Sequence, residues 1–194
     1  MPQTVCIIQG HPHATGKHLC HALAQAYADG AKAAGARVRR FDIGSMTFSL
    51  LDNPADFGTA PPDEIRSAQE AIRAADHVVV IYPLWLGTMP AIVKGFFEQL
   101  CRNNFAISND ARGGWPKQML KGKTARVIVT MGMPAAAYKL FFGAKGVQSF
   151  ESGILGMAGI KPIRETLIGG VGALSRPKAE ALLARTRRLG QSLT

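Results

Sequence analysis

The amino-acid sequence predicts an α/β fold in which a doubly wound, five-stranded parallel sheet carries helices on both faces. Short segments rich in β-branched residues recur along the chain, and segments with apolar residues at helical spacing stand between them. Right-handed crossovers between parallel strands place such helices on both faces of the sheet. The length of 194 residues suits one hydrophobic core, so we expect a single domain over residues 1–194.

Five segments have the pattern of strands. The clearest is residues 77–82, His-Val-Val-Val-Ile-Tyr, because its unbroken apolar run indicates a strand covered on both faces. The other four expected strands are residues 4–8, 37–43, 124–130 and 163–168. A parallel sheet of these strands needs a crossover between each pair.

Five helices are expected in these crossovers and at the end of the chain. Apolar residues at helical spacing mark them. They are a segment from Leu19 that ends near Gly35, residues 63–75, a segment whose first helical residue is Pro90, a segment marked by Val147, Phe150, Ile154 and Leu155, and a last helix that Ser175 caps before Pro177. The stretch 44–62 is expected to be a long loop.

Charge and cysteine content narrow the class of protein. The chain has 23 Lys and Arg against 13 Asp and Glu, a net charge of +10 that attracts anions. The basic residues are scattered and accompany no nucleic-acid motif. We therefore interpret them first as solvated surface residues and second as a surface for a phosphate-bearing nicotinamide or an anionic membrane, and we expect no nucleic acid.

The three separated cysteines suit a reducing cytoplasm. With neither a leader pattern nor a membrane-length apolar run, membrane contact is expected to be peripheral at most.

Three loops follow strands and look specialised: residues 10–18, 83–90 and 130–146. In a doubly wound sheet, ligands bind beyond the carboxyl ends of the strands, where the strand order reverses. If the strand assignments hold, all three loops lie on that edge. We therefore expect the functional site there.

The loop 10–18 leads into a helix N-terminus, whose free amides favour a phosphate, and Thr15 and Lys17 can add donors. It departs from a nucleotide-binding P-loop, because five residues separate Gly10 from Gly16 and His18 stands where a magnesium-binding Ser or Thr belongs. Four histidines crowd this region, His11, His13, His18 and His21. No Asp, Glu or Cys completes a metal site, so hydrogen bonding to phosphate or loop backbone is favoured over metal binding.

The loop 83–90 combines prolines with Trp85 and Gly87, so its backbone can approach a flat ring closely. Trp85 is also compatible with a place in the core or in a dimer interface. The stretch 81–98, I-Y-P-L-W-L-G-T-M-P-A-I-V-K-G-F-F-E, resembles the P-L-W-W-G-x-M-P-A-x-L-K-G-F segment of the NAD(P)H:quinone oxidoreductase family, flavodoxin-like flavoproteins with bacterial NAD(P)H dehydrogenase (quinone) members. Gly10-His11-Pro12 resembles the phosphate loop of that family, and residues 130–133 with Tyr138 resemble the segment beside the flavin pyrimidine.

The resemblance implies a flavodoxin-like fold and a flavin, FAD or FMN, reduced by NADPH or NADH. It implies a ping-pong reaction: nicotinamide passes a hydride to flavin N5 and leaves, and a quinone or similar acceptor then takes two electrons in the same place. By the resemblance, the flavin phosphate is held by His11, Thr15, Gly16, Lys17 and His18. The isoalloxazine is framed by Pro83, Leu84, Trp85, Leu86, Gly87, Thr130, Met131, Gly132 and Met133. Tyr138 faces the substrate pocket.

The chain departs from the family pattern at three positions. Leu86 stands where many relatives have a second Trp, and Met133 where animal quinone reductases have a second Gly. Lys145-Gly146 stands where those relatives have His-Gly. Lys145 is thus a second candidate catalytic residue that stabilises anionic hydroquinone, with a solvated loop lysine as the equal alternative.

Partners and two other functions stay open. The resemblance implies a homodimer with the site at its interface, and residues 44–62 and 105–116, the latter with Trp115, are candidate partner-facing segments. The chain is alternatively a non-enzymatic, flavodoxin-like electron carrier. The second alternative is a regulatory subunit of a cation-efflux transporter, since some relatives accompany potassium-efflux systems and a charge of +10 can aid membrane association.

Overall fold

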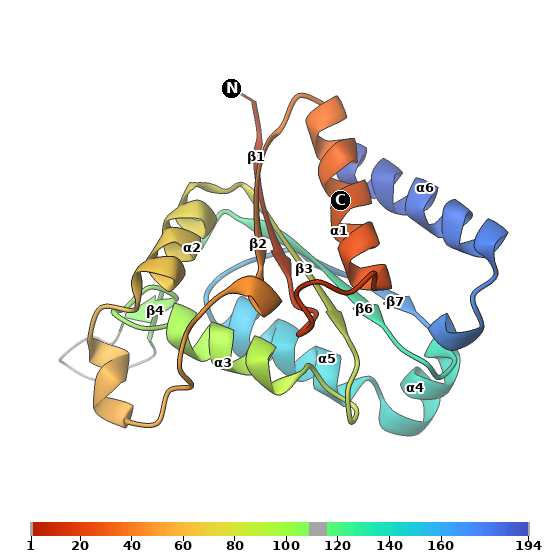
Figure 1. Ribbon diagram of the computed structural model, residues 1–194. Helices are drawn as coiled ribbons and strands as arrows, with labels where there is room; N and C mark the ends of the chain where they lie inside the picture. Colours follow the sequence, from red (N-terminus) through yellow and green to blue (C-terminus); the bar gives the residue numbers. More distant parts are fainter. Residues whose placement is uncertain (1, 109–115, 194) are drawn as a thin grey trace.

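A five-stranded parallel sheet forms the centre of the molecule (Figure 1). The structure, a computed structural model, describes residues 2–108 and 116–193. The strands lie in the order β2 (Arg37–Asp42), β1 (Thr4–Gln9), β3 (His77–Pro83), β6 (Thr124–Thr130) and β7 (Ile163–Ile168). This confirms the predicted α/β sheet. The order reverses between β1 and β3, which is the arrangement of flavodoxin-like folds.

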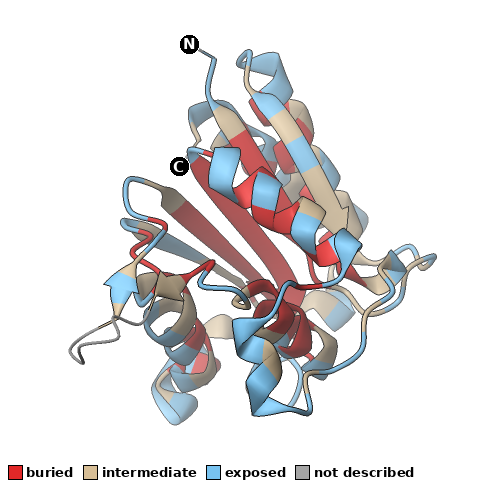
Figure 2. Ribbon diagram, turned by 90° about the vertical axis from the view of Figure 1, so that its left-hand side faces the viewer, coloured by how far each residue is buried: buried red, intermediate tan, exposed pale blue. Residues whose placement is uncertain are grey.

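Helices cover both faces of the sheet. On one face, α1 (Leu19–Ala33) and α6 (Arg176–Ser192) pack over alternate residues of β1 and β3 such as Ile7 and Val79. On the other, α2 (Asp63–Ala74), α3 (Ala91–Leu100) and α5 (Lys145–Phe150) pack over Val78 and Val80. The central strands are accordingly buried on both sides (Figure 2), as the apolar run 77–82 predicts.

The strand register brings the predicted loops to one edge. Gln9 pairs with Ile81, Pro83 with Thr130, and Thr130 with Ile168, so β1, β3, β6 and β7 end at similar heights. Because all strands are parallel, the loops that follow them leave from the same side. The reversal point between β1 and β3 therefore lies between the loop after Gln9 and the loop after Pro83.

The stretch after β6 differs from its prediction as a loop. Residues Ala135–Phe142 form helix α4, and the expected fourth helix is divided into α5 and a π-helical segment, Glu151–Gly156. Helix α4 shows no clear separation of an apolar and a polar face, because Leu140, Phe141 and Phe142 are all exposed. Its three leading alanines supply helix propensity instead.

Smaller differences concern loops and helix ends. Residues 107–108 and 117–118 form a short antiparallel pair, β4 (Ile107–Ser108) and β5 (Lys117–Gln118), and 3₁₀ turns occupy Ile43–Ser45 and Pro54–Gly58. Pro90 is the N-cap of α3 and not its first helical residue. Ser175 is the N-cap of α6, as predicted, but its side chain makes no capping hydrogen bond. No helix within the described ranges is long and apolar enough to span a membrane.

Candidate functional site

The loop after β3 forms a tight turn at the carboxyl edge. The backbone N–H of Trp85 donates to the carbonyl of Thr88 at 2.8 Å, and that of Thr88 donates back at 3.0 Å. Leu86 and Gly87 turn the chain with φ values of +49° and +82°. A left-handed φ favours glycine and is costly for Leu86, whose side chain is fully exposed. The turn thus presents a large apolar side chain to solvent at its tip.

Helices α4 and α5 hold this turn in place. The hydroxyl of Tyr138, in α4, donates to the carbonyl of Gly87 at 2.8 Å, and the tyrosine is completely buried. At Gly146, in α5, a Cβ atom would lie 2.1 Å from the same carbonyl oxygen, so only glycine allows this approach. Burial raises the pKa of Tyr138. The neighbouring Lys145 is the exposed first residue of α5.

A cavity of about 440 Å³ opens beside the turn, between the ends of β3 and β6. It is lined by Leu84, Leu86, Gly87, Met131, Gly132, Met133, Tyr138 and Phe142. All but Phe142 are residues that the sequence assigns to the isoalloxazine or to the substrate pocket, and the structure brings them together. Three more predicted residues do not line it, because Pro83 and Thr130 are buried strand ends and Trp85 lies on the other side of the turn.

The loop 10–18 is closed by its own histidine rings. His11 and His18 stack with their centroids 3.7 Å apart, and His13 Nδ1 lies 2.9 Å from His18 Nε2. Thr15 Oγ1 lies 3.4 Å from His13 Nε2. At Gly16, a Cβ would come within 2.1 Å of His18 Nε2. Three of the five residues predicted to hold a phosphate, His11, Gly16 and His18, therefore lie together. Thr15 joins them through His13, and Lys17 is exposed beside them.

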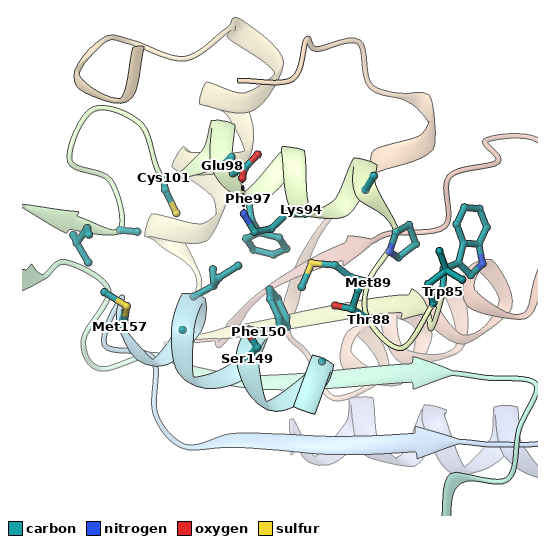
Figure 3. Close-up of a pocket in the computed structure, with 18 of the residues that line it drawn as sticks. Trp85, Thr88, Met89, Lys94, Phe97, Glu98, Cys101, Ser149, Phe150 and Met157 are labelled. Carbon is teal, nitrogen blue, oxygen red and sulfur yellow. Dashed lines mark hydrogen bonds and ion pairs between the residues drawn. The ribbon is translucent and has the colours of Figure 1, made fainter. Parts of the chain in front are cut away.

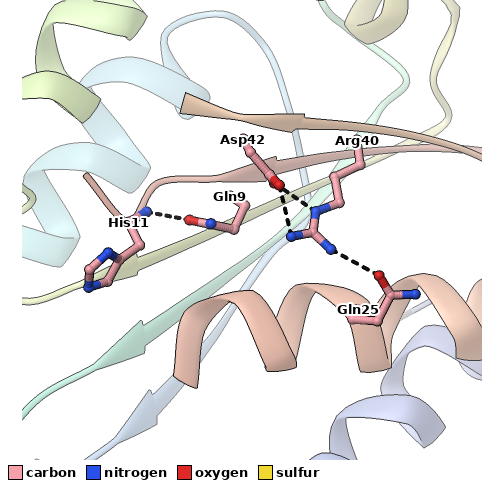
Figure 4. A network of polar contacts seen from close by, with 5 residues as sticks. All are labelled: Gln9, His11, Gln25, Arg40 and Asp42. Atoms are coloured by element: carbon pink, nitrogen blue, oxygen red, sulfur yellow. Dashed lines mark hydrogen bonds and ion pairs between the residues drawn. The ribbon is translucent and has the colours of Figure 1, made fainter. Parts of the chain in front are cut away.

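The histidine cluster is hydrogen-bonded to the end of β1, and a separate polar network lies at the end of β2. The backbone N–H of His11 donates to the side-chain carbonyl of Gln9, and Arg40 pairs with Asp42 and donates to Gln25 (Figure 4). The His11 ring meets the edge of Trp85 at a centroid distance of 6.4 Å, which links the first and second loops. Within the described part of the chain, no three His, Cys, Asp or Glu side chains are arranged to hold a metal ion.

Burial favours the neutral imidazole at two of these histidines, His11 and His21. Desolvation, followed by the positive charges of His18 and His21, lowers the pKa of His11 to about 4. Desolvation also lowers the pKa of His21, with Asp42 acting in the opposite direction. Both ring nitrogens of His21 are buried without a hydrogen-bond partner among the described residues.

A second, larger cavity of about 890 Å³ lies between α3 and the helices after α4 (Figure 3). Its lining is mainly apolar, with Met89, Phe97, Phe150 and Met157, and the Lys94–Glu98 ion pair at 2.5 Å is its main charged feature. Trp85 and Leu86 line its end, so the turn 85–88 separates it from the cavity at the β3 and β6 ends.

Sequence reasoning missed this larger cavity. Its residues show apolar residues at helical spacing, a pattern that is as typical of core packing as of a cavity lining. Only their position next to Trp85 indicates a cavity. Phe57 and Ile107 line it, and they belong to the two segments predicted to face a partner. Of the segment 105–116, residues 109–115 with Trp115 lie outside the described residues.

Comparison with known proteins agrees with this fold. The family model described as the flavodoxin-like fold matches residues 3–193. The chain belongs to this family. A Haemophilus influenzae protein named as an uncharacterized NAD(P)H oxidoreductase is 24% identical over 182 residues, covering 91% of this chain and 89% of the relative.

Two further proteins have related names. A Hahella chejuensis FMN-dependent NADH:quinone oxidoreductase is 30% identical over 95 residues, 48% of this chain and 43% of that relative. The structure of an NAD(P)H:quinone oxidoreductase from Methanothermobacter marburgensis superposes with a TM-score of 0.80 at 23% identity and covers 100% of both chains. These matches confirm the resemblance to oxidoreductases of the flavodoxin-like fold.

Proposed function

We propose that the chain is a flavin-dependent NAD(P)H oxidoreductase that passes two electrons to a quinone or a similar small acceptor. The observation that carries the proposal is the cavity at the carboxyl ends of β3 and β6, whose lining comes almost entirely from residues assigned to a flavin site. Its volume of about 440 Å³ is within the range of small-molecule sites, ~300–1,000 Å³. The names of the relatives support the reaction class and a flavin.

The residues present fit a flavin in chemistry as well as position. Gly132 has nothing within 4 Å of where its Cβ would be, so the backbone there is open to a flat ligand. Apolar Leu84, Met131 and Met133 suit the faces of an aromatic ring, and backbone groups of the turn 85–88 suit its polar edge. The loop 10–18 at the start of α1 suits a phosphate. FMN and FAD both meet these requirements.

The side chains have separate parts in the proposed reaction. Bound flavin supplies the redox chemistry, hydride acceptance at N5 from NADPH or NADH and its return to the acceptor in a ping-pong cycle. The protein positions and shields the reactants. Tyr138 holds the turn 85–88 through Gly87, while Leu86 and Phe142 exclude water from the open side of the cavity. Lys145 places a positive charge near the turn, where it favours an anionic hydroquinone.

The proposal includes a homodimer in which a second copy covers the larger cavity. Exposed Leu86 and the cavity residues Phe57 and Met157 leave an apolar surface that a partner can bury. Sedimentation of the purified protein at several concentrations tests this, and a monomer at all of them would contradict it.

We also propose a cytoplasmic location.

The first experiment is the visible spectrum of the protein saturated with FMN or FAD, before and after anaerobic NADPH or NADH. Loss of the absorption of a protein-bound flavin establishes nicotinamide-linked reduction, and addition of a quinone should restore it. Tight flavin binding without reduction by either nicotinamide would favour the electron carrier or the transporter subunit. Failure of both flavins to bind would overturn the proposed function.

Lys145→Ala is expected to lower turnover with a quinone severalfold, because the variant removes a positive charge that stabilises the anionic product. Flavin reduction by NADPH, measured separately by stopped flow, should be unaffected. Unchanged quinone kinetics would show that Lys145 is a solvated lysine without a role in turnover.

A further inference from the structure

Four of the five histidines of the chain lie within eleven residues of one another in sequence, at the loop 10–18 and the first turn of α1. They are His11, His13, His18 and His21. The fifth, His77, lies in the core. The proposed function uses this loop to hold a phosphate but does not explain why so many titratable rings stand there.

The hydrogen bonds of the cluster limit how many protons it holds in this conformation. The backbone N–H of His13 donates to His11 Nδ1 at 3.1 Å, so that nitrogen carries no proton and His11 is neutral. His13 Nδ1 and His18 Nε2 are 2.9 Å apart and share one hydrogen, so His13 and His18 are not both cations. The closed arrangement therefore excludes positive charge on His11 and on one of the pair His13 and His18.

The surroundings of the rings agree with a low charge. The His11 and His18 planes are inclined by only 16°, a stacking that two cations would oppose. The charged groups that face the cluster from β2 are Arg40 and Asp42, and these two are paired with each other at 2.7 Å. No carboxylate stands in the first turn of α1. Among the described residues, Asp42 is thus the carboxylate that faces the cluster, and its pairing with Arg40 leaves little to compensate several imidazolium charges.

A phosphate bound in the loop would favour protonated histidine rings, whereas the closed loop holds few protons. An imidazole nitrogen that is unprotonated repels a phosphate oxygen, because both are acceptors, whereas an imidazolium ring donates from both nitrogens. The rings of His13 and His18 now pack against the backbone at Gly16, the part of the loop that a phosphate needs. A bound phosphate must therefore replace contacts between the rings, and it gains most from rings that take up protons.

We infer that the cluster of His11, His13, His18 and His21 couples binding of the flavin phosphate to proton uptake, so that the protein holds phosphate-bearing flavins more tightly as the pH falls. The inference rests on the proposed function. It makes the histidines specificity-determining residues that distinguish FMN and FAD from riboflavin. It also predicts that flavin is released as the pH rises above the ordinary range of histidine titration.

The test compares three flavins by fluorescence titration between about pH 6 and about pH 8.5, where histidines titrate. FMN, FAD and riboflavin are bound to the flavin-free purified protein at constant ionic strength. If binding takes up one proton, the affinity falls by up to about tenfold for each unit by which the pH rises. We expect FMN and FAD to lose at least about tenfold in affinity over this range, and riboflavin to bind with little pH dependence. FAD controls for the titration of the FMN phosphate itself, whose second pKa is about 6.

Variants assign the proton to the cluster. His13→Gln with His18→Gln should flatten the pH dependence for FAD, and His13→Gln alone should reduce it. Lys17→Gln is the matched control, because it removes a permanent charge from the same loop: it should weaken FAD binding at every pH and keep the slope. Calorimetry in two buffers with different ionisation enthalpies counts the protons, about one for the parent protein and fewer for the double variant.

The outcomes separate this inference from the proposed function. Equal pH dependence for riboflavin and FAD, or an unchanged slope in the double variant, would overturn the inference and leave a flavoprotein. If the double variant does not fold, the single variant and the riboflavin comparison still decide. If none of the three flavins binds the parent protein, the proposed function fails, and the inference fails with it.

Discussion

Tyr138 is fully buried although it lies beside a cavity. Its ring lines the cavity at the β3 and β6 ends, yet its side chain is inaccessible to solvent and its hydroxyl is already bonded to Gly87. A hydroxyl held in this way orients the backbone of the turn 85–88. We therefore assign Tyr138 a positioning role.

Tyr138→Phe tests this role. The variant keeps the ring and removes one hydrogen bond worth about 1 kcal/mol, so the dissociation constant of the flavin should rise roughly fivefold. Turnover at saturating flavin should fall less than the affinity does. Flavin titration of the variant and the parent measures the effect, and identical dissociation constants would contradict a positioning role.

His77 makes stability depend on pH from a position far from the site. It is 2% exposed, and its nitrogens lie 2.9 Å from the Tyr27 hydroxyl and 2.6 Å from the Thr124 hydroxyl. Desolvation, with Arg126 and Arg164 nearby, lowers its pKa to about 4. Because the unfolded chain protonates first, the free energy of unfolding should fall as the pH drops from about 6.5 to about 4, by about 3 kcal/mol in total.

Urea denaturation of the parent and of His77→Gln over that pH interval measures this contribution. Glutamine keeps hydrogen-bonding groups but does not titrate, so the variant should be less stable at neutral pH and lose less stability on acidification. Parallel pH profiles for the two proteins would show that His77 is not the titrating group.

At the scale of elements, the turn 85–88 depends on α5 as much as on its own sequence. Gly146 brings the first turn of α5 against the carbonyl of Gly87, while Leu84 donates its backbone N–H to Thr130 at 2.7 Å. The turn is thereby fixed to β6 on one side and to α5 on the other. These contacts hold Leu86 in its left-handed backbone conformation despite the steric strain of that conformation.

Gly146→Ala should displace the turn, because the new Cβ would overlap the carbonyl oxygen of Gly87. We expect flavin affinity to fall by about tenfold or more, with a loss of about 1–3 kcal/mol in stability. Gly172→Ala is the matched control, since nothing lies within 4 Å of its Cβ position. Equal flavin affinity in the two variants would show that the turn adapts freely.

At the scale of the whole molecule, the net charge of +10 acts on every anionic reactant. The described ion pairs involve few of the basic residues, and several of these pairs are largely exposed, so most of the positive field is available to solvent. A cofactor that carries phosphates is attracted over the range of a Debye length.

The Michaelis constant for NADPH should therefore rise severalfold between about 20 mM and about 500 mM NaCl, as added salt screens this attraction. Turnover at saturating NADPH should change little, because the chemical step involves no long-range encounter. Steady-state kinetics at fixed pH measure both values, and a salt-independent Michaelis constant would contradict electrostatic attraction of the cofactor.

Local patterns predict the sheet and most helices because burial on two faces leaves a clear apolar signal, as in residues 77–82. They also place the three loops, since parallel strands share an edge. Helix α4 is not predicted, because its apolar residues are exposed and show no alternation of core and solvent faces. The closeness of Gly146 to Gly87 is invisible in sequence, because 59 positions separate two residues that touch only through tertiary packing.

The sequence predicts some features of the candidate site and not others. The lining of the β3 and β6 cavity follows from loop position, whereas Phe142 joins it only because α4 forms. The mutual hydrogen bonds of His11, His13 and His18 depend on side-chain directions that no spacing rule supplies. Resemblance to a family cannot supply them either, since the motif that the loop shares with it is only Gly10-His11-Pro12.

The double burial of β3 has a consequence for how ligand binding can be observed. β3 is hydrogen-bonded to β1 on one edge and to β6 on the other, and Val79 and Ile81 have no exposed surface. Amide protons in such a strand exchange with deuterium only when the whole sheet opens. A flavin that binds only the folded chain slows this exchange, because it raises the free energy of unfolding. The increase is about 2.7 kcal/mol when the flavin concentration is roughly a hundred times its dissociation constant. The deuterium uptake of Val79 and Ile81 thus measures flavin affinity from residues with no surface open to a ligand.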